Sequence, residues 1–227
     1  MRLRISGDRM LIAAFGDGVD PLVNERVRRM AALVAALRHS AIEAVVPAYC
    51  TLALHYDPDA IGWTALVDLL RSCEQRLAEA EVPEARTIEI PVCYGDPFGP
   101  DLEAVAVHAG LTSEEVIRLH SDADYRIYAI GFAPGFCYLG GLDPRIHAPR
   151  LTMPRLHVPA GSVGIAGGQT GVYPLASPGG WQLIGRTPLR LFVPDREPPI
   201  FYQPGDTVRF RPIAAEHFDR LAKEDER

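Results

Sequence analysis

The sequence predicts an α+β protein in two parts: a small two-layer α+β N-terminal domain with the element order ββαββα, followed by an all-β barrel or sandwich. Two observations carry this prediction. Residues 131–212 hold 26 of the 40 glycine and proline residues in the 227-residue chain. Residues 1–80 instead alternate strand-like runs with apolar residues at helical spacing. We place the expected boundary after residue 90, which gives domains 1–90 and 91–227.

In the N-terminal part, residues 3–6 and 10–15 are predicted as strands on either side of a turn. Asp20 is typical of a helix N-cap and Pro21 of the first helical position. Two further strand-like runs follow, and then a second helix. The apolar residues at helical spacing are Val23, Val27, Met30, Val34 and Leu37 in the first helix, and Trp63, Leu66, Leu70, Cys73 and Leu77 in the second. This order favours an antiparallel sheet with both helices on one face.

In the C-terminal part, residues 86–94 lead out of the first domain, and Thr112 with Glu115 offers a capping box for a short helix. Many short strands with glycine and proline between them indicate a barrel or sandwich. The predicted strands are 125–132, 162–167, 170–175, 181–187, 190–194, 200–202 and 207–213. The charged tail receives no assignment.

Composition and charge exclude several classes of function. The formal net charge of −6 argues against nucleic acid or an anionic membrane as the main partner. Lys223 is the only lysine, so neither a GxxxxGK[ST] phosphate loop nor a lysine Schiff base can form. The four cysteines form no CxxC pair and the histidines no metal-binding spacing, so we expect no metal site and a reducing, cytoplasmic location.

The segment 131–143, GFAPGFCYLGGLD, places glycines among aromatic residues directly after a predicted strand. Glycine lets a backbone approach a ligand closely, and the aromatic side chains would surround it. A tight connection across the mouth of a barrel, with its aromatics in the core, explains the same pattern. The residues predicted to frame a site here are Phe132, Pro134, Gly135 and Phe136.

The segment 158–187 is the most informative stretch of the chain. Its five glycines between residues 161 and 171 do not form a GxGxxG motif, but they could turn backbone N–H groups toward an anion. Arg186 is the expected carboxylate or phosphate partner, because its planar guanidinium binds two oxygens at once. Hairpin turns with an exposed arginine fit equally well. The predicted substrate-binding residues are Gly161, Ser162, Gly168, Gln169, Thr170, Ser177, Trp181 and Arg186.

A general acid or base is the remaining candidate. His147 and His157 lie ten residues apart in a proline-rich segment, and either could act as a general acid or base because histidine is the side chain suited to proton transfer near neutral pH; His157 is the predicted catalytic residue. An isolated histidine is more often structural or solvated. Cys137 is expected to be a small buried apolar residue rather than a reactive thiol, since no lysine or acid is adjacent to lower its pKa.

Taken together, residues 131–188 closely resemble the family that contains the B subunit of 5-oxoprolinase (PxpB), the kinase inhibitor KipI and allophanate hydrolase subunit 1. The likeness extends into the N-terminal part through the FGD and VVPAY…LHYDP elements. Cys137 departs from the family pattern, in which proline is expected in GFPYLGG. The resemblance implies that the C-terminal domain is a cyclophilin-like β-barrel, in agreement with the strand pattern.

The resemblance also implies a function in a complex. Family members work with a homologous barrel subunit (PxpC, KipA-type), and a third subunit (PxpA, LamB/YcsF-type) completes a 5-oxoprolinase. That enzyme hydrolyses ATP, with Mg, while it opens 5-oxo-L-proline to L-glutamate. We therefore expect a subunit of such an enzyme, with ATP bound by the complex and the isolated chain inactive. Two alternatives stay open: a KipI-like inhibitor of a sensor histidine kinase, and a subunit of an allophanate or urea amidolyase-type carboxylase system.

Overall fold

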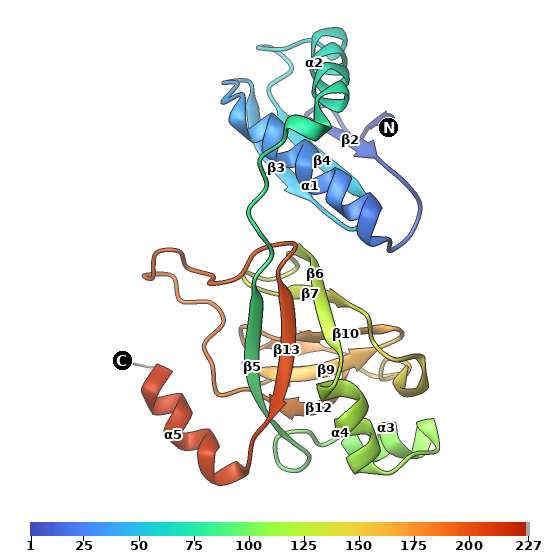
Figure 1. Ribbon diagram of the computed structural model, residues 1–227, viewed down its shortest axis with the longest axis vertical. Helices are drawn as coiled ribbons and strands as arrows, with labels where there is room; N and C mark the ends of the chain where they lie inside the picture. The colour runs from blue at the N-terminus through green and yellow to red at the C-terminus, as the bar shows by residue number, and fades with distance from the viewer. Residues whose placement is uncertain (226–227) are drawn as a thin grey trace. The chain divides into compact units, whose positions relative to one another are not determined.

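The structure, a computed structural model, describes residues 1–225 (Figure 1). Its contacts divide the chain into two compact units, Met1–Glu84 and Ala85–Arg227. The division falls ahead of the expected boundary after residue 90, because β5 (Thr87–Tyr94) pairs along its length with a strand near the end of the chain. A boundary at residue 90 would cut this strand, which belongs wholly to the second unit.

The N-terminal unit has the predicted ββαββα order. Its sheet has the strand order β1-β2-β4-β3 and is antiparallel throughout. The elements are β1 (Arg2–Ile5), β2 (Met10–Ala14), α1 (Pro21–Ala36), β3 (Ile42–Pro47), β4 (Thr51–Tyr56), α2 (Trp63–Gln75) and the 3-10 turn η1 (Leu77–Glu79).

One face of this sheet carries the core of the unit. Burial alternates along β2 and β4, as expected when one face of a sheet is covered and the other is not. The apolar stripes of α1 and α2 pack on that face, so the predicted two-layer arrangement is confirmed. The α1 N-terminus is capped as predicted: the Asp20 carboxylate accepts hydrogen bonds from the backbone N–H groups of Leu22 and Val23 over 2.8 and 2.9 Å.

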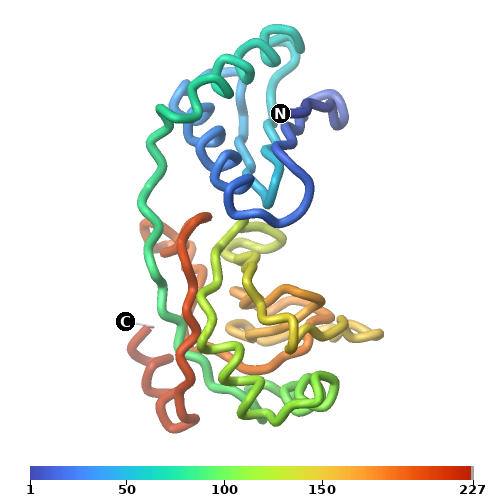
Figure 2. The backbone as a smooth tube through the Cα atoms, turned by 45° about the vertical axis from the view of Figure 1, so that its right-hand side comes forward, coloured from blue at the N-terminus to red at the C-terminus, as the bar shows by residue number. Residues whose placement is uncertain are grey.

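The second unit is a closed seven-stranded barrel in the order β10-β7-β6-β13-β5-β12-β9. Figure 2 shows its strands curling around a common interior. The barrel strands are β5, β6 (Asp124–Ile130), β7 (Cys137–Gly140), β9 (Ser162–Ala166), β10 (Gln169–Val172), β12 (Gln182–Arg186) and β13 (Thr207–Pro212). The fold class predicted from the sequence is therefore confirmed. The pairing of β5 with β13 is parallel and spans Thr87↔Thr207 to Val92↔Pro212.

Helices and a small sheet surround the barrel. They are α3 (Leu102–Ala109), α4 (Ser113–Ser121), the 3-10 turn η2 (Pro144–Ile146), the two-stranded sheet of β8 (Arg155–Val158) with β11 (Ser177–Gly179), and α5 (Ala215–Asp225). The predicted capping box at α4 is present, with Thr112 and Glu115 each bonding the backbone of the other.

Two predicted strands, 190–194 and 200–202, are wrong, because neither stretch forms a strand in the structure. Prolines at 188, 194, 198 and 199 remove backbone donors that a ladder needs. Conversely, the sequence did not predict β7, β8 and β11, which are short and lie in glycine- and proline-rich segments. The tail, which received no assignment, forms α5, and its Phe218 packs on Phe98 with ring centroids 4.5 Å apart.

All four cysteines are free thiols. Cys137 is fully buried, and burial raises its pKa to about 12, so it is the inert apolar residue that the sequence indicated. Within residues 1–225, no helix combines the length and apolar character that crossing a bilayer requires. The same range holds no group of three or more histidine, cysteine or acidic side chains arranged to bind a metal ion.

Candidate functional site

A cleft of about 430 Å³ lies on the outside of the barrel, and we call it the aromatic cleft. It is lined by Phe132, Phe136, Tyr138, Arg150, Pro154, Tyr173, Pro178, Gly179, Gly180 and Trp181. Its volume lies within the range of small-molecule sites, which are mostly apolar with a few polar groups. It therefore has the size and lining of a binding site.

Strand alternation places the aromatic rings here. Along β7, Cys137 and Leu139 enter the barrel core, whereas Phe136 and Tyr138 face the opposite way. Phe136 is the centre of the ring cluster: its centroid lies 4.9 Å from that of Tyr138, 5.7 Å from that of Tyr173 and 5.6 Å from that of Trp181. All three pairs are edge-to-face, the geometry that aromatic rings favour. The rings of Phe136, Tyr173 and Trp181 are almost fully buried, so they form a closely packed floor of the cleft.

Glycine is required where the backbone crosses this floor. A Cβ atom on Gly179 would lie 2.5 Å from the Tyr173 hydroxyl oxygen, which is closer than any real contact. At the neighbouring Gly180, a Cβ atom would lie 3.6 Å from Pro154, an ordinary van der Waals distance. The two glycines that precede Trp181 therefore differ in role, and only Gly179 lets the chain pass directly over the Tyr173 ring.

Phe132 forms an exposed wall of the aromatic cleft. Its backbone φ is +68°, a left-handed conformation that is uncommon for a bulky residue and costs free energy. Its side chain is 69% exposed and meets Phe136 edge-on, with centroids 5.5 Å apart. A large apolar side chain held in a costly conformation and left exposed is typical of a ligand-contacting position rather than of a packing one.

Arg150 is the only charged residue of the described range 1–225 that lines the aromatic cleft. Its neighbour Arg155 is already neutralised, because its guanidinium bonds the Asp101 carboxylate over 2.7 Å. Burial raises the pKa of Tyr173, while a hydrogen bond from the Trp181 backbone and the charges of Arg150 and Arg155 oppose that rise. Tyr173 therefore offers a neutral hydroxyl at physiological pH, close to an arginine without an acidic partner in residues 1–225.

A second cleft of about 370 Å³, the arginine cleft, lies where β12 meets α5. It is lined by Ala160, Gly161, Pro174, Leu175, Arg186, Thr187, Pro188, Leu189, Arg190, Phe192, Pro194, Phe218 and Ala222. The Arg186 Nε donates to the Ala160 carbonyl over 2.8 Å, and its guanidinium lies 5.8 Å from the Phe218 ring centroid. Among residues 1–225, two arginines, Arg186 and Arg190, and no acidic side chain line this cleft, so this part of the chain makes it electropositive.

The structure distributes the predicted site residues over different places. Phe132, Phe136 and Trp181 line the aromatic cleft, and Gly161 and Arg186 line the arginine cleft. Gly135 is buried against Phe192 and Pro174, which line the arginine cleft, and its carbonyl accepts a hydrogen bond from the Tyr202 hydroxyl. Pro134 is exposed beside it. The predicted residues thus do not gather around a single concavity.

The remaining predicted residues line neither cleft. Ser162 is buried in β9, Gly168 lies in the exposed turn before β10 against His147, Gln169 is half-buried in β10, and Ser177 donates to the Pro178 carbonyl within β11. Gly161, whose N–H was expected to face an anion, donates that N–H to the Tyr173 carbonyl over 2.7 Å. The His157 side chain is exposed on β8 and makes no hydrogen bond or ion pair to residues 1–225.

Thr170 belongs to a buried relay inside the barrel. Its hydroxyl donates to the Gly164 carbonyl over 3.0 Å and lies 2.8 Å from His120 Nε2, while the Tyr94 hydroxyl lies 2.7 Å from His120 Nδ1. Because the Thr170 proton goes to Gly164, His120 Nε2 carries a proton and Nδ1 accepts from Tyr94. Burial lowers the pKa of His120 to about 3, so the ring is neutral and structural.

Sequence reasoning missed three of these residues. Arg150 lies in a proline-rich segment without aromatic residues, where its only signal is a positive charge. Tyr173 reads as part of a strand, and its place under Gly179 depends on the pairing of β8 with β11. His120 lies on α4, and its two partners come from β5 and β10, which are distant in sequence.

Comparison with known proteins gives several relatives. A protein named as the B subunit of 5-oxoprolinase, from Bacillus subtilis (strain 168), is 44% identical over 229 residues, which cover 96% of this chain and 95% of the relative. A protein of the same name from Escherichia coli O157:H7 is 55% identical over 156 residues, 69% of this chain and 71% of the relative. A urea amidolyase from Lachancea kluyveri is 24% identical over 97% of this chain, which spans only 14% of that protein.

Among solved structures, the crystal structure of TTHA0988 matches 91% of this chain with a TM-score of 0.81 and 40% identity. This chain spans about 40% of that longer protein. The family model described as "Carboxyltransferase domain, subdomain C and D" matches residues 1–202. These findings confirm the resemblance inferred from residues 131–188. The chain belongs to the carboxyltransferase domain, subdomain C and D family, together with the proteins named as the B subunit of 5-oxoprolinase.

Proposed function

We propose that this chain is the B subunit of an ATP-dependent 5-oxoprolinase, which opens 5-oxo-L-proline to L-glutamate together with partner subunits. The observation that carries the proposal is the 44% identity to the Bacillus subtilis protein of that name, over nearly the whole length of both chains. The word subunit in the name supports a complex. The proposed partners are the PxpC (KipA-type) barrel subunit and the PxpA (LamB/YcsF-type) subunit, and the isolated chain is inactive.

The reaction needs two anion sites, and this chain offers two electropositive clefts. The substrate carries a carboxylate, and ATP supplies a phosphoryl group that turns the amide oxygen of the stable lactam into a leaving group. Arg150 faces the aromatic cleft and Arg186 the arginine cleft. Arg186 binds an anion of the reaction in this proposal, and ATP with Mg is held by the assembled complex. His157 is the proposed general acid or base. Its side chain is exposed on β8 in this chain, and a partner subunit would cover it in the complex.

The test is reconstitution. The chain is co-purified with its candidate partners, and 5-oxo-L-proline-dependent ATP hydrolysis and L-glutamate formation are measured with each subunit omitted in turn. Both activities should appear only in the full mixture. A stable complex whose ATP hydrolysis does not respond to 5-oxo-L-proline would show that the substrate or the class of function is wrong.

A urea-related function is the second candidate, because the Lachancea kluyveri relative named urea amidolyase is similar along 97% of this chain. The low identity of 24% makes it the weaker one. The same complex assayed with urea and allophanate in place of 5-oxo-L-proline distinguishes the two: the main proposal requires that neither compound stimulates ATP hydrolysis.

A further inference from the structure

We infer that the aromatic cleft binds the small ring-shaped carboxylate on which the complex acts, and that Arg150 is the residue that binds its carboxylate. The inference rests on the proposed function, which supplies 5-oxo-L-proline as the ligand. It adds which of the two clefts receives this ligand, and through which residue.

The charges around the aromatic cleft select an anion. Arg150 has no hydrogen bond or ion pair to any residue in the range 1–225, and no acidic side chain lines the cleft. Arg155, the other arginine whose charge acts on Tyr173, is held by Asp101, and the Asp101 carboxylate also accepts a hydrogen bond from the Leu183 backbone N–H over 2.6 Å. The guanidinium of Arg150 is therefore the free cation of the cleft, with the planar geometry that carboxylates match.

The shape of the cleft selects a small flat ring. Phe136, Tyr173 and Trp181 form a floor of rings set edge-to-face, and Phe132 adds an exposed wall. A five-membered lactam has two apolar faces to lay on such rings. The Tyr173 hydroxyl gives a polar partner for the amide edge, since its pKa is raised and the hydroxyl stays protonated.

The arginine cleft fits this ligand less well. Prolines, leucines and small residues share its walls with two phenylalanines, which form no ring pair with each other. Its Arg186 already donates to Ala160 and covers Phe218, so part of its binding capacity serves the fold. A ring with a carboxylate therefore has better partners in the aromatic cleft.

Steady-state kinetics of the complete complex test the inference with three variants, Arg150→Gln, Arg150→Lys and Arg220→Gln. Arg220 is an exposed arginine on α5 that lines neither cleft, so it controls for the loss of one positive charge. Arg150→Gln removes a charge-assisted hydrogen bond to the ligand. Its loss should raise the KM for 5-oxo-L-proline about 10- to 100-fold. The KM for ATP should stay unchanged. In Arg150→Lys, the KM for 5-oxo-L-proline should lie between those of the wild type and of Arg150→Gln.

A second ligand separates carboxylate binding from a general disturbance of the cleft. 2-Pyrrolidinone has the same lactam ring without the carboxylate, so its inhibition constant should be equal in the wild type and in Arg150→Gln. An active wild-type complex in which both Arg150 variants keep the wild-type KM for 5-oxo-L-proline would overturn the inference and leave the proposed function standing. A wild-type complex that does not respond to 5-oxo-L-proline at all would overturn the proposed function and, with it, the ligand named here.

Discussion

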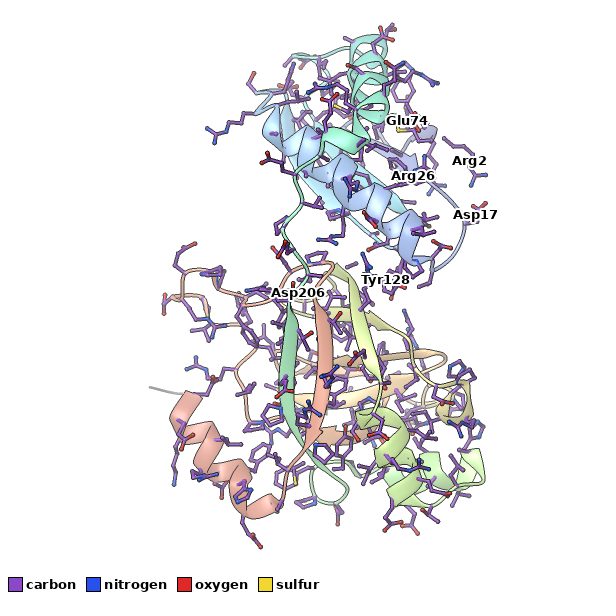
Figure 3. All side chains as sticks on the ribbon, in the orientation of Figure 1. Arg2, Asp17, Arg26, Glu74, Tyr128 and Asp206 are labelled. Carbon is purple, nitrogen blue, oxygen red and sulfur yellow. The ribbon has the colours of Figure 1, made fainter. Side chains whose placement is uncertain are left out.

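Asp206 holds Arg86 at the point where the chain enters the barrel. The Arg86 guanidinium donates to Asp206 Oδ2 over 2.7 Å, and the Arg86 backbone N–H donates to Oδ1 over 3.0 Å. The Gln203 N–H donates to the same carboxylate over 3.1 Å. Asp206 is fully buried, and Figure 3 marks its position at the start of β13. The contact therefore joins the first residue before β5 to the turn before β13 and fixes where their parallel pairing begins.

This contact predicts that Asp206→Ala destabilises the barrel unit strongly. Removing the carboxylate leaves the backbone N–H groups of Arg86 and Gln203 without their buried acceptor. The free energy of unfolding should fall by about 2 to 4 kcal/mol. Urea denaturation of the full chain measures the loss. Arg211→Gln on the same strand is the control, because Arg211 and Glu89 form an exposed pair that adds little. Equal stability of the two variants would contradict this role for Asp206.

The buried relay predicts a pH dependence of stability. The pKa of His120 falls from 6.5 to about 3 on folding, so the unfolded chain takes up a proton below pH 6.5 that the folded chain does not. The contribution of His120 is complete above pH 6.5 and is lost as the pH falls toward 3. Relative to His120→Phe, the wild type should therefore lose about 1.4 kcal/mol of unfolding free energy per pH unit between about pH 6 and 4.

Tyr94→Phe is the matched control for this prediction. It removes the hydroxyl that donates to His120 Nδ1 and costs about 1 kcal/mol at every pH. It keeps the buried imidazole, so its unfolding free energy should still fall more steeply with decreasing pH than that of His120→Phe. Denaturant titrations from pH 8 to 4 measure both variants. If the unfolding free energy of His120→Phe depends on pH as that of the wild type does, folding does not lower the pKa of His120.

The sequence predicts local structure well because local signals determine it. Asp20 and Pro21 mark the start of α1, and Thr112 with Glu115 marks the start of α4, through bonds between residues two or three positions apart. The strand order of the barrel depends instead on pairings such as Thr87↔Thr207, which no local pattern encodes. The same limit applies to the site: Trp181 and Phe136 were recognised as aromatic candidates, whereas Arg150 joins them only through the folded chain.

The two glycines before Trp181 give a prediction about the aromatic cleft. In Gly179→Ala, the new methyl group meets the Tyr173 hydroxyl and ring, which is buried and cannot swing away. We expect a KM for 5-oxo-L-proline raised at least about tenfold, which corresponds to about 1.4 kcal/mol, and a lower melting temperature. Gly180→Ala has room for its methyl group and should behave as the wild type. A larger change in KM and melting temperature in Gly180→Ala than in Gly179→Ala would show that Tyr173 does not shape the cleft.

Arg186 gives the last prediction, because it tests whether the arginine cleft takes part in the reaction. If Arg186 binds a phosphoryl oxygen of ATP, Arg186→Ala should raise the KM for ATP or lower kcat in the reconstituted complex, and leave the KM for 5-oxo-L-proline unchanged. Arg186 also covers Phe218 of α5, so a purely structural role predicts faster hydrogen exchange in residues 215–225 with normal kinetics. Phe218→Leu is the matched variant, since it loses the ring under the guanidinium but keeps the arginine. Kinetics that change in Phe218→Leu as much as in Arg186→Ala would assign the effect to α5 and remove Arg186 from the binding residues.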